Sequence, residues 1–441
     1  MRFRRAPWRV VIVCSVALLC LVCKKNPVAP EVTQNVQLSL EYATCKEVAL
    51  KIGFSDAPNG SAYRIVRNDN YTLAGTFSGP FAIVYDTMVM AATSYQYVGS
   101  RVLNGQIKEF GSPVSVTTLD STRHNVSWQL FTLGDGSGSS ELYDVSIIND
   151  TLAYAVGQIY KLDSIGNIDY QPYNLATWNG KAWTIQKVPY HFQGTVNYSP
   201  FLTLFALSAN DIWLGGNGII HFDGTTFTEV LAFNSVWGSY AVRKMWGDSS
   251  SLYVVGDAGA AAYYDGVTWT RLSTGTGLDF RDVYGATDPH SGEEQVLAVC
   301  TRNYPVDKGI LRFSGGNVTS LSTSQMPYEL FGIWFIPNEH YYAVGDGIYE
   351  KRNLWDTSWL NGPLDITRYV ITKVRGNATN DVFAVGAFGE VIHYNGSSWT
   401  SYISQTGLTN GSYAGLGVKG NTVIAVGLDG GLAVAAVGKK F

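Results

Sequence analysis

Four short runs of sequence decide the fold: RKMWG (243–247), LYVVG (252–256), AAAYYDG (260–266) and TWTRL (268–272). Each run is rich in β-branched or aromatic residues, and turn residues such as Gly and Asp separate one run from the next. Short runs of this composition at close spacing favour four antiparallel strands joined by tight turns. The stretch 243–272 is therefore predicted to form one small four-stranded sheet.

The second of these runs recurs along the chain. Apolar runs ending in a small residue occur in seven places, with last residues Gly157, Gly215, Gly256, Cys300, Gly345, Gly386 and Gly427. Successive ends lie 41 to 58 residues apart, a spacing typical of repeat proteins whose unit is a four-stranded sheet. The chain is therefore predicted to be all-β, with a seven-bladed β-propeller over residues 126–441.

Four of the units also carry a turn signal after their third strand. These Asn-Gly or Asp-Gly dipeptides favour hairpins with type I′ turns. They are Asn179-Gly180, Asp223-Gly224, Asp265-Gly266 and Asn395-Gly396.

The seventh unit ends after its third strand and lacks the aromatic fourth strand. The missing sequence lies upstream of the first unit, where Asn125-Val-Ser-Trp128 matches Gly396-Ser-Ser-Trp399 in phase. We therefore expect residues 126–132 to complete the last blade and close the ring. Closure of this kind leaves no free radial edge that could aggregate with another chain.

Beyond the general class, the units resemble bacterial surface propellers and partly resemble Asp-box repeats. The resemblance rests on the apolar run ending in Val-Gly, the Asp-Gly or Asn-Gly turn, and an aromatic residue three positions later, as in Trp269. In true Asp-boxes one residue separates the Asp from the Gly, whereas Asp223 and Asp265 directly precede their glycines. The match to Asp-box repeats is therefore partial. The resemblance implies a fold and no particular activity.

The first residues are predicted to direct export. Four arginines precede the apolar run VVIVCSVALLCLV (10–22), which is too short to span a bilayer and is typical of a secretory signal over residues 1–22. The end of the run resembles the lipobox of bacterial lipoproteins, with Cys23 as the acylated residue and Cys20 as a possible substitute. This resemblance implies an outer-membrane lipoprotein of the cell envelope that contacts the membrane through its lipid anchor alone. Simple secretion and an uncleaved anchor are the alternatives.

A short linker, residues 23–31, contains Pro27 and Pro30 and precedes a second predicted unit at 32–120. Strand-like runs at 48–54, 62–68, 95–103 and 112–119 predict a β-sandwich there. The segments Val89–Tyr97 and 112–118 resemble fibronectin type III domains, in which a tyrosine closes a corner by bonding backbone through its hydroxyl. The resemblance assigns that role to Tyr95 and implies that the unit is a spacer or an adhesion module.

Composition limits the choice of partner. The chain has 31 basic and 35 acidic residues and a formal net charge of −4, so no basic surplus is present to neutralise a phosphate backbone. We expect no nucleic-acid partner. His221 and His393 occupy the same position in their units, which favours packing over metal binding, and the sequence predicts neither a metal site nor a cofactor.

Candidate site residues lie on the first strand of each unit, because that strand is innermost in a propeller. Side chains at equivalent positions converge near the axis and differ from unit to unit, while their apolar neighbours do not. Aromatic and charged groups at a concave mouth suit a peptide, protein or glycan ligand. The predicted binding residues are Trp246, Tyr284, Trp334, Arg375, Lys244 and Lys373.

Three functions fit these residues. The first is a non-catalytic recognition or scaffolding protein at the cell envelope that binds a protein or glycan. The second is a glycoside hydrolase or lyase that uses the axial carboxylates Asp144 and Asp282 as general acid and base. The third is a purely structural channel lined by charges that neutralise one another.

Overall fold

The computed structural model describes residues 36–55, 61–192, 195–362 and 365–441. The predicted signal segment at 1–22, the linker at 23–31 and the candidate lipidation residues Cys20 and Cys23 lie outside the described residues. Within the described ranges, no helix is both long enough and apolar enough to cross a membrane.

Seven antiparallel sheets of four strands make up most of the molecule. Blade 1 consists of β10 (Glu141–Asn149), β11 (Leu152–Ile159), β12 (Tyr173–Trp178) and β13 (Trp183–Gln186). Blade 2 consists of β16 (Thr203–Ser208), β17 (Asp211–Gly215), β18 (Ile219–Phe222) and β19 (Phe227–Glu229). Blade 3 consists of β20 (Val242–Gly247), β21 (Leu252–Gly256), β22 (Ala261–Tyr264) and β23 (Trp269–Arg271). Blade 4 consists of β24 (Asp279–Thr287), β25 (Glu294–Arg302), β26 (Asp307–Ser314) and β27 (Asn317–Leu321). Blade 5 consists of β28 (Leu330–Ile336), β29 (His340–Gly345), β30 (Gly347–Lys351) and β31 (Leu360–Asn361). Blade 6 consists of β32 (Ile371–Ala378), β33 (Asp381–Gly386), β34 (Val391–Tyr394) and β35 (Trp399–Ser401).

The seventh blade joins the two ends of the propeller sequence. It contains β36 (Gly411–Lys419), β37 (Thr422–Asp429), β38 (Leu432–Lys440) and, as its outermost strand, β9 (Val126–Leu133). β9 pairs with β38 in antiparallel register, with Trp128 opposite Gly438, and the Trp128 ring lies 5.5 Å from that of Tyr402. The prediction that residues 126–132 complete the last blade is confirmed.

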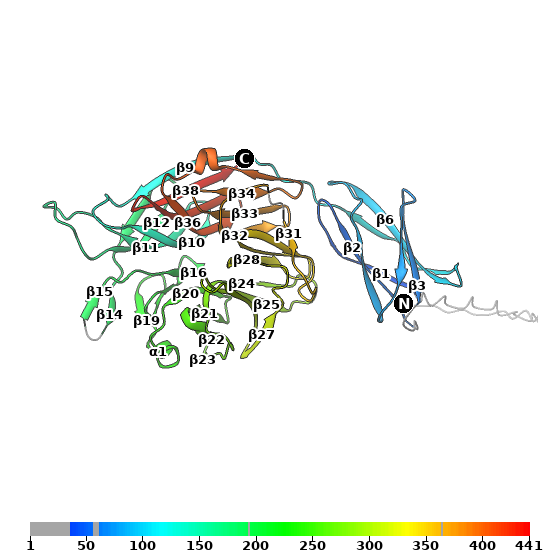
Figure 1. The fold of residues 1–441 in the computed structure, drawn as a ribbon, viewed down its shortest axis with the longest axis horizontal. Coiled ribbons are helices and arrows are strands. Elements are labelled where there is room, and N and C mark those ends of the chain that lie inside the picture. The colour runs from blue at the N-terminus through cyan, green and yellow to red at the C-terminus, as the bar shows by residue number, and fades with distance from the viewer. Residues whose placement is uncertain (1–35, 56–60, 193–194, 363–364) are drawn as a thin grey trace, which may run out of the picture.

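The blades form a closed ring. The first strand of each blade contacts the first strands of both neighbouring blades, and the cycle closes between β36 and β10. Figure 1 shows these first strands gathered at the centre of the propeller, with the outer strands at its rim. The sequence-derived strands of blade 3 coincide with β20 to β23 within one or two residues.

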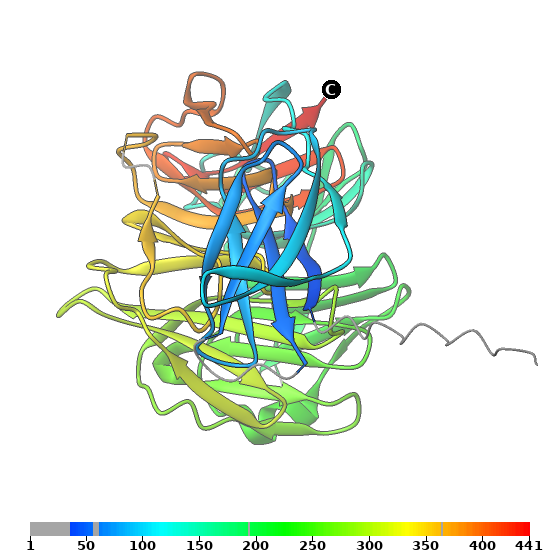
Figure 2. The same ribbon diagram turned by 90° about the vertical axis from the view of Figure 1, so that its right-hand side faces the viewer.

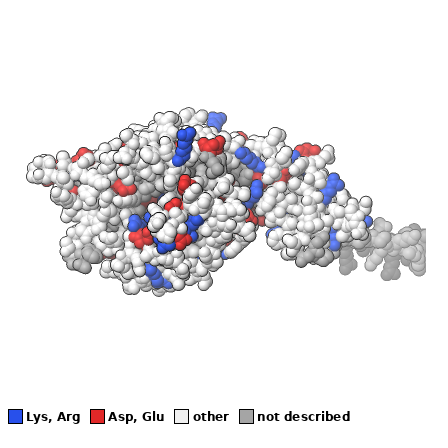
Figure 3. Space-filling view, in the orientation of Figure 1, with Lys and Arg blue, Asp and Glu red and all other residues white. Residues whose placement is uncertain are grey.

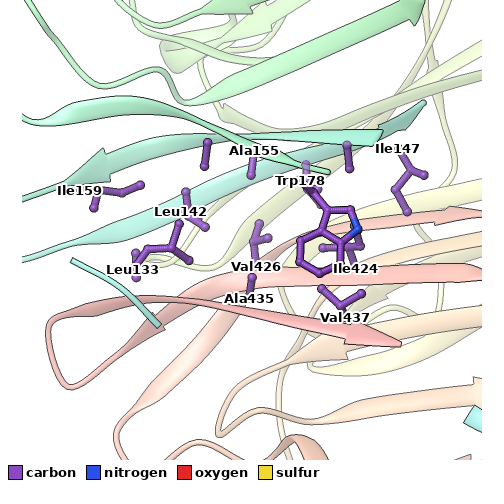
Figure 4. Close-up of a cluster of buried hydrophobic side chains, with 14 residues drawn as sticks. Leu133, Leu142, Ile147, Ala155, Ile159, Trp178, Ile424, Val426, Ala435 and Val437 are labelled. Carbon is purple, nitrogen blue, oxygen red and sulfur yellow. The ribbon is translucent and has the colours of Figure 1, made fainter. Parts of the chain in front are cut away.

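Buried side chains lie mainly between the blades. Among the described residues there are eight hydrophobic clusters, one for each of the seven interfaces between neighbouring blades and one in the N-terminal unit. The cluster between blades 7 and 1 combines Leu133 of β9, Trp178 of β12 and Val437 of β38, as Figure 4 shows. Ring closure therefore also completes a hydrophobic core.

The turns after the third strands differ from the prediction. Gly180, Gly224, Gly266 and Gly396 have positive φ between 88 and 95°, but the Asn or Asp before each does not, so these turns are not type I′. The Asp223 carboxylate instead accepts hydrogen bonds from the backbone N–H groups of Thr225 and Thr226, both at 2.8 Å. An Asp or Asn side chain that accepts these hydrogen bonds stabilises the turn, so the residue itself does not need the left-handed backbone conformation.

Several elements depart from the simple repeat. A small hairpin of β14 (Tyr190–Phe192) and β15 (Thr195–Asn197) follows blade 1, and the helix α1 (Leu231–Trp237) follows blade 2. The short 3₁₀ segment η1 (Asp257–Gly259) lies within blade 3, and the helix α2 (Ile403–Thr406) follows blade 6. The sequence reading did not anticipate these insertions.

The N-terminal unit consists of two sheets with a shared core. One sheet has the order β1 (Val36–Ala43), β2 (Val48–Phe54), β5 (Phe81–Asp86). The other has the order β4 (Thr72–Thr76), β3 (Ala62–Arg67), β6 (Ser94–Leu103), β7 (Gln106–Phe110), with β8 (Val114–Thr117) also paired with β6. Leu50, Ile65 and Tyr97 belong to the core that the two sheets share. The Tyr95 hydroxyl accepts a hydrogen bond from the Met90 backbone N–H at 2.8 Å, the kind of backbone contact expected of this tyrosine.

The N-terminal unit lies against the rim of blades 5 and 6 (Figures 1 and 2). Glu47 forms an ion pair with Arg352 at 2.6 Å, and Lys46 donates to the Ser397 carbonyl oxygen. In the connecting segment, the Thr122 hydroxyl donates to the Asn380 carbonyl oxygen at 2.5 Å. These contacts give the two units a defined interface.

Candidate functional site

The axis of the propeller is lined at one level by seven residues from the first strands. Pairing with the second strands places Asp144, Lys244, Asp282 and Lys373 at equivalent positions, opposite the valines at 156, 255, 299 and 385. Leu204, Gly332 and Gly415 occupy this level in the other three blades. The predicted convergence of four charged residues is present.

Glycine at two of these positions allows neighbouring strands to approach closely. A Cβ atom on Gly415 would lie 2.8 Å from the Cα atom of Asp144, and one on Gly332 would lie 3.0 Å from the Cα atom of Lys373. Contacts this short exclude larger side chains unless the backbone shifts. The axis therefore accommodates long charged side chains from some blades, because two other blades have glycine, which has no side chain, at this level.

Asp144 connects blades 1, 2 and 3. The Lys244 ammonium lies 2.5 and 2.6 Å from its two carboxylate oxygens. The same carboxylate accepts hydrogen bonds from the Thr203 hydroxyl at 2.8 Å and the Leu204 backbone N–H at 3.1 Å. Asp144 is 2% exposed, so these charge-assisted bonds are shielded from solvent.

Asp282 connects blades 4, 5 and 6 in the same way. The Arg375 guanidinium binds it through two parallel bonds of 2.8 and 2.9 Å, and the Ile333 backbone N–H donates to it at 3.1 Å. The Lys373 ammonium lies 3.4 Å from Asp282 and donates to the carbonyl oxygens of Arg281 at 2.6 Å and Phe331 at 3.3 Å. Each carboxylate therefore joins three consecutive blades.

The protonation states follow from this pairing. Burial acts to raise the pKa of Asp282, but the positive charges of Arg375 and Lys373 outweigh it and hold that pKa below its usual range. Burial lowers the pKa of Lys373 to about 8, and the nearby Lys244 and Arg375 add to the effect. Asp282 is thus a carboxylate at neutral pH, held in a bidentate ion pair.

This arrangement does not suit the predicted catalytic pair. A general acid must hold a proton near neutral pH, which requires a raised pKa, and Asp282 has a lowered one. Asp144 is enclosed by three donors from blades 2 and 3. The chemistry that these groups support is electrostatic attachment of one blade to the next.

Next to the charged level is a cavity of about 330 Å³. Of the predicted binding residues, Trp246, Tyr284, Arg375 and Lys244 line it, and Phe205 and Lys419 join them. Figure 3 shows basic and acidic side chains close together near the middle of the propeller face in view. Lys419 was not predicted, although it lies on the first strand of blade 7 four positions beyond the axial residue Gly415.

Two predicted binding residues lie elsewhere. Trp334 is 2% exposed and packs between blades 5 and 6, where a Cβ on Gly376 would come within 2.9 Å of its ring. The Trp334 side chain turns toward the neighbouring blade and away from the axis, so it does not line the cavity. Lys373 is buried against Asp282 and does not line the cavity.

The remaining candidates have local roles. His221 and His393 each contact the first residue of the second strand in their own blade, Asp211 at 2.8 Å and Asp381 at 3.1 Å. Burial raises the pKa of Cys300 to about 12, so its thiol is not an activated nucleophile. Across the described ranges, no group of three or more His, Cys, Asp or Glu residues is arranged to hold a metal ion.

A histidine pair that was not predicted lies at the outer edge of the ring closure. The Nδ1 atoms of His124, just before β9, and His393 in blade 6 are 3.0 Å apart. His393 also contacts Asp381, which receives a bond from Lys440 of β38. Burial and the neighbouring His393 lower the pKa of His124 below its ordinary value.

Comparison with known proteins supports the architecture. No family model matches the chain, and no curated protein matches it. A solved structure described as YCF48 bound to D1 peptide matches with a TM-score of 0.53 and 14% identity, covering 73% of this chain and 99% of that chain. YCF48 from Cyanidioschyzon merolae matches with a TM-score of 0.50 and 13% identity, covering 70% and 98%. At these identities the likeness shows the fold alone, a β-propeller.

Proposed function

We propose that this chain is a non-catalytic recognition or scaffolding protein that binds a segment of a partner protein through its axial cavity. The observation that carries the proposal is the pairing of both axial carboxylates across three blades each, beside a cavity lined by aromatic and basic side chains. The carboxylates stabilise the ring, and the cavity is left for a ligand.

A propeller of similar fold supports the ligand class. The YCF48 structure is described as bound to a D1 peptide, so that protein takes a peptide ligand. By analogy, we propose a peptide segment for this chain, at the cavity lined by Trp246 and Tyr284. In the same proposal the N-terminal unit acts as a fibronectin-like spacer, and the exported, lipid-anchored chain presents the propeller at the bacterial envelope.

Capture from solubilised envelope fractions tests the proposal. Immobilised full chain is compared with Trp246→Leu, which alters the cavity, and with Trp355→Ala, a control at a side chain that is 63% exposed elsewhere. We expect a defined set of proteins to be captured by the unaltered chain and the control and lost from Trp246→Leu. Equal capture by all three would contradict the proposal.

The enzyme alternative is tested in parallel. A panel of aryl glycosides and polysaccharides is incubated with the unaltered chain and with Asp282→Asn, and product is measured. The proposal expects no turnover by either protein. Turnover by the unaltered chain that is lost in an Asp282→Asn variant shown by circular dichroism to be folded would establish the alternative. Capture of a glycan without turnover would replace the protein ligand by a sugar.

A further inference from the structure

The charges around the axis do not cancel. Lys244, Lys373 and Arg375 carry three positive charges, and the two carboxylates carry two negative ones. These five groups form one set, because Asp282, Lys244, Arg375 and Asp144 all act on the pKa of Lys373. One positive charge therefore has no counter-charge within the set.

The cavity extends this excess. Its charged lining residues are Lys244, Arg375 and Lys419, and no carboxylate lines it. Lys419 is exposed at the end of β36 and has no ion pair among the described residues. A cavity with only basic charges is notable in a chain whose formal net charge is −4.

Apolar side chains and Ser146 complete the walls of the cavity. Val145, Ile147, Leu204, Leu416 and Val418 line it together with the aromatic rings. A cavity of about 330 Å³ has the volume of only about eleven water molecules at about 30 Å³ each in the liquid. This space holds a few residues of an extended chain and no folded domain. The shape and lining suit a short segment with one negative charge and some apolar surface.

We propose that the axial cavity binds a carboxylate of a partner polypeptide, with the anion facing Lys419 and Arg375. This inference rests on the proposed function and adds the chemical class of the bound group. The carboxylate comes either from the C-terminus of the partner chain or from an acidic side chain. Lys244 and Arg375 are already paired with Asp144 and Asp282, so Lys419 is the basic lining residue without an ion pair among the described residues. A single carboxylate matches the charge of Lys419, whereas a phosphate group would carry roughly 1.5 to 2 negative charges.

Binding of labelled peptides tests this inference. Three hexapeptides of the same apolar composition carry a zwitterionic rhodamine dye at the N-terminus and differ only in their anionic group. The first has a free C-terminal carboxylate, the second a C-terminal amide, and the third a C-terminal amide with one Asp near the end. Fluorescence anisotropy of the full chain at low ionic strength gives each affinity, since screening weakens such contacts at high salt.

We expect at least one carboxylate peptide to bind about tenfold more tightly than the uncharged amide. A preference for the first peptide identifies a chain terminus, and a preference for the third identifies an acidic side chain. Equal binding of all three peptides, or none by any, overturns the inference. Displacement by inorganic phosphate at concentrations where acetate has no effect also overturns it, because the site would then prefer a different anion.

Variants of Lys419 test whether the carboxylate binds in the cavity. Lys419→Glu is expected to weaken binding of the preferred peptide about tenfold or more, and Lys419→Gln to weaken it less. Lys181→Glu makes the same charge change at an exposed turn of blade 1 and is expected to leave the affinity unaltered. Unaltered binding by Lys419→Glu overturns the inference. If Trp246→Leu still abolishes partner capture in that case, the proposed function stands and only the carboxylate assignment fails.

Discussion

Six blades of the propeller come from continuous stretches of chain, whereas the seventh combines strands from both ends of the propeller sequence. The continuous blades are connected at the axis, where Asp144 joins blades 1 to 3 and Asp282 joins blades 4 to 6. Blade 7 contributes only glycine at that level and is secured at its outer edge by β9 and the residues near His124. The ring thus has two kinds of attachment, one electrostatic and axial, the other a strand at the periphery.

The strongest test of this difference replaces β9. We expect exchange of residues 126–133 for a Gly-Ser stretch of equal length to abolish the cooperative monomer, because it removes a whole strand and part of the blade 7–blade 1 core. The matched control replaces Trp183–Gln186, the outermost strand of blade 1. Size-exclusion chromatography and thermal unfolding by circular dichroism give the outcome. If both replacements have the same effect, blade 7 depends no more on its outer strand than blade 1 does.

The next test removes an axial carboxylate. Asp282→Asn leaves Arg375 and Lys373 without their buried counter-charge, and such a loss typically costs about 3–5 kcal/mol in free energy of unfolding. Asp346→Asn, at an exposed position, is expected to change it by less than about 0.5 kcal/mol. Urea unfolding at pH 7 measures both. If Asp282→Asn lowers the free energy of unfolding no more than Asp346→Asn does, the apolar cores alone stabilise the ring of blades.

A smaller effect is expected from acid at the ring closure. The pKa of His124 is lowered in the fold, so the unfolded chain binds the proton more readily and stability falls as pH drops below about 6.5. We expect His124→Gln to remove part of this pH dependence between pH 7.5 and 5.5. His221→Gln is the control, because His221 has the same position as His393 in a continuous blade and contacts Asp211. If His221→Gln removes as much of the dependence, the acid sensitivity does not originate at the closure.

The smallest effect concerns the contact between the two units. Arg352 is 40% exposed and Glu47 is 10% exposed, and ion pairs near the surface contribute about 0.2–1 kcal/mol. A double-mutant cycle with Glu47→Gln and Arg352→Gln is expected to give a coupling energy in that range. A coupling energy indistinguishable from zero would mean that this pair does not help to position the N-terminal unit.

The repeat explains how much of the fold was predictable. Each second strand has a purely apolar run, and its spacing identified the blades and the composite seventh one. The turn type was predicted wrongly because the side chains of Asp223 and Asn395 bind backbone N–H groups, a contact that the dipeptide alone does not reveal. Helix α1 and the β14–β15 hairpin were missed because they interrupt the repeat.

The site was predictable only in part. Equivalent positions on the first strands identified Trp246, Tyr284 and Arg375 at the cavity. The direction of an individual side chain depends on its neighbours, and Trp334 turns over Gly376 into the interface between blades 5 and 6. Contacts such as His124 with His393 join residues 269 positions apart and follow no periodic rule.

The pairing of β9 with β38 also sets the order in which the molecule can mature. Synthesis delivers β9 early, yet its partner among the described strands is β38 (Leu432–Lys440), which follows every other strand of the propeller. During the whole interval the hydrogen-bonding groups of β9 must remain unpaired or be protected by other factors. Completion of the ring is thus a late event, and a chain interrupted shortly before residue 432 would carry six finished blades and an unclosed gap.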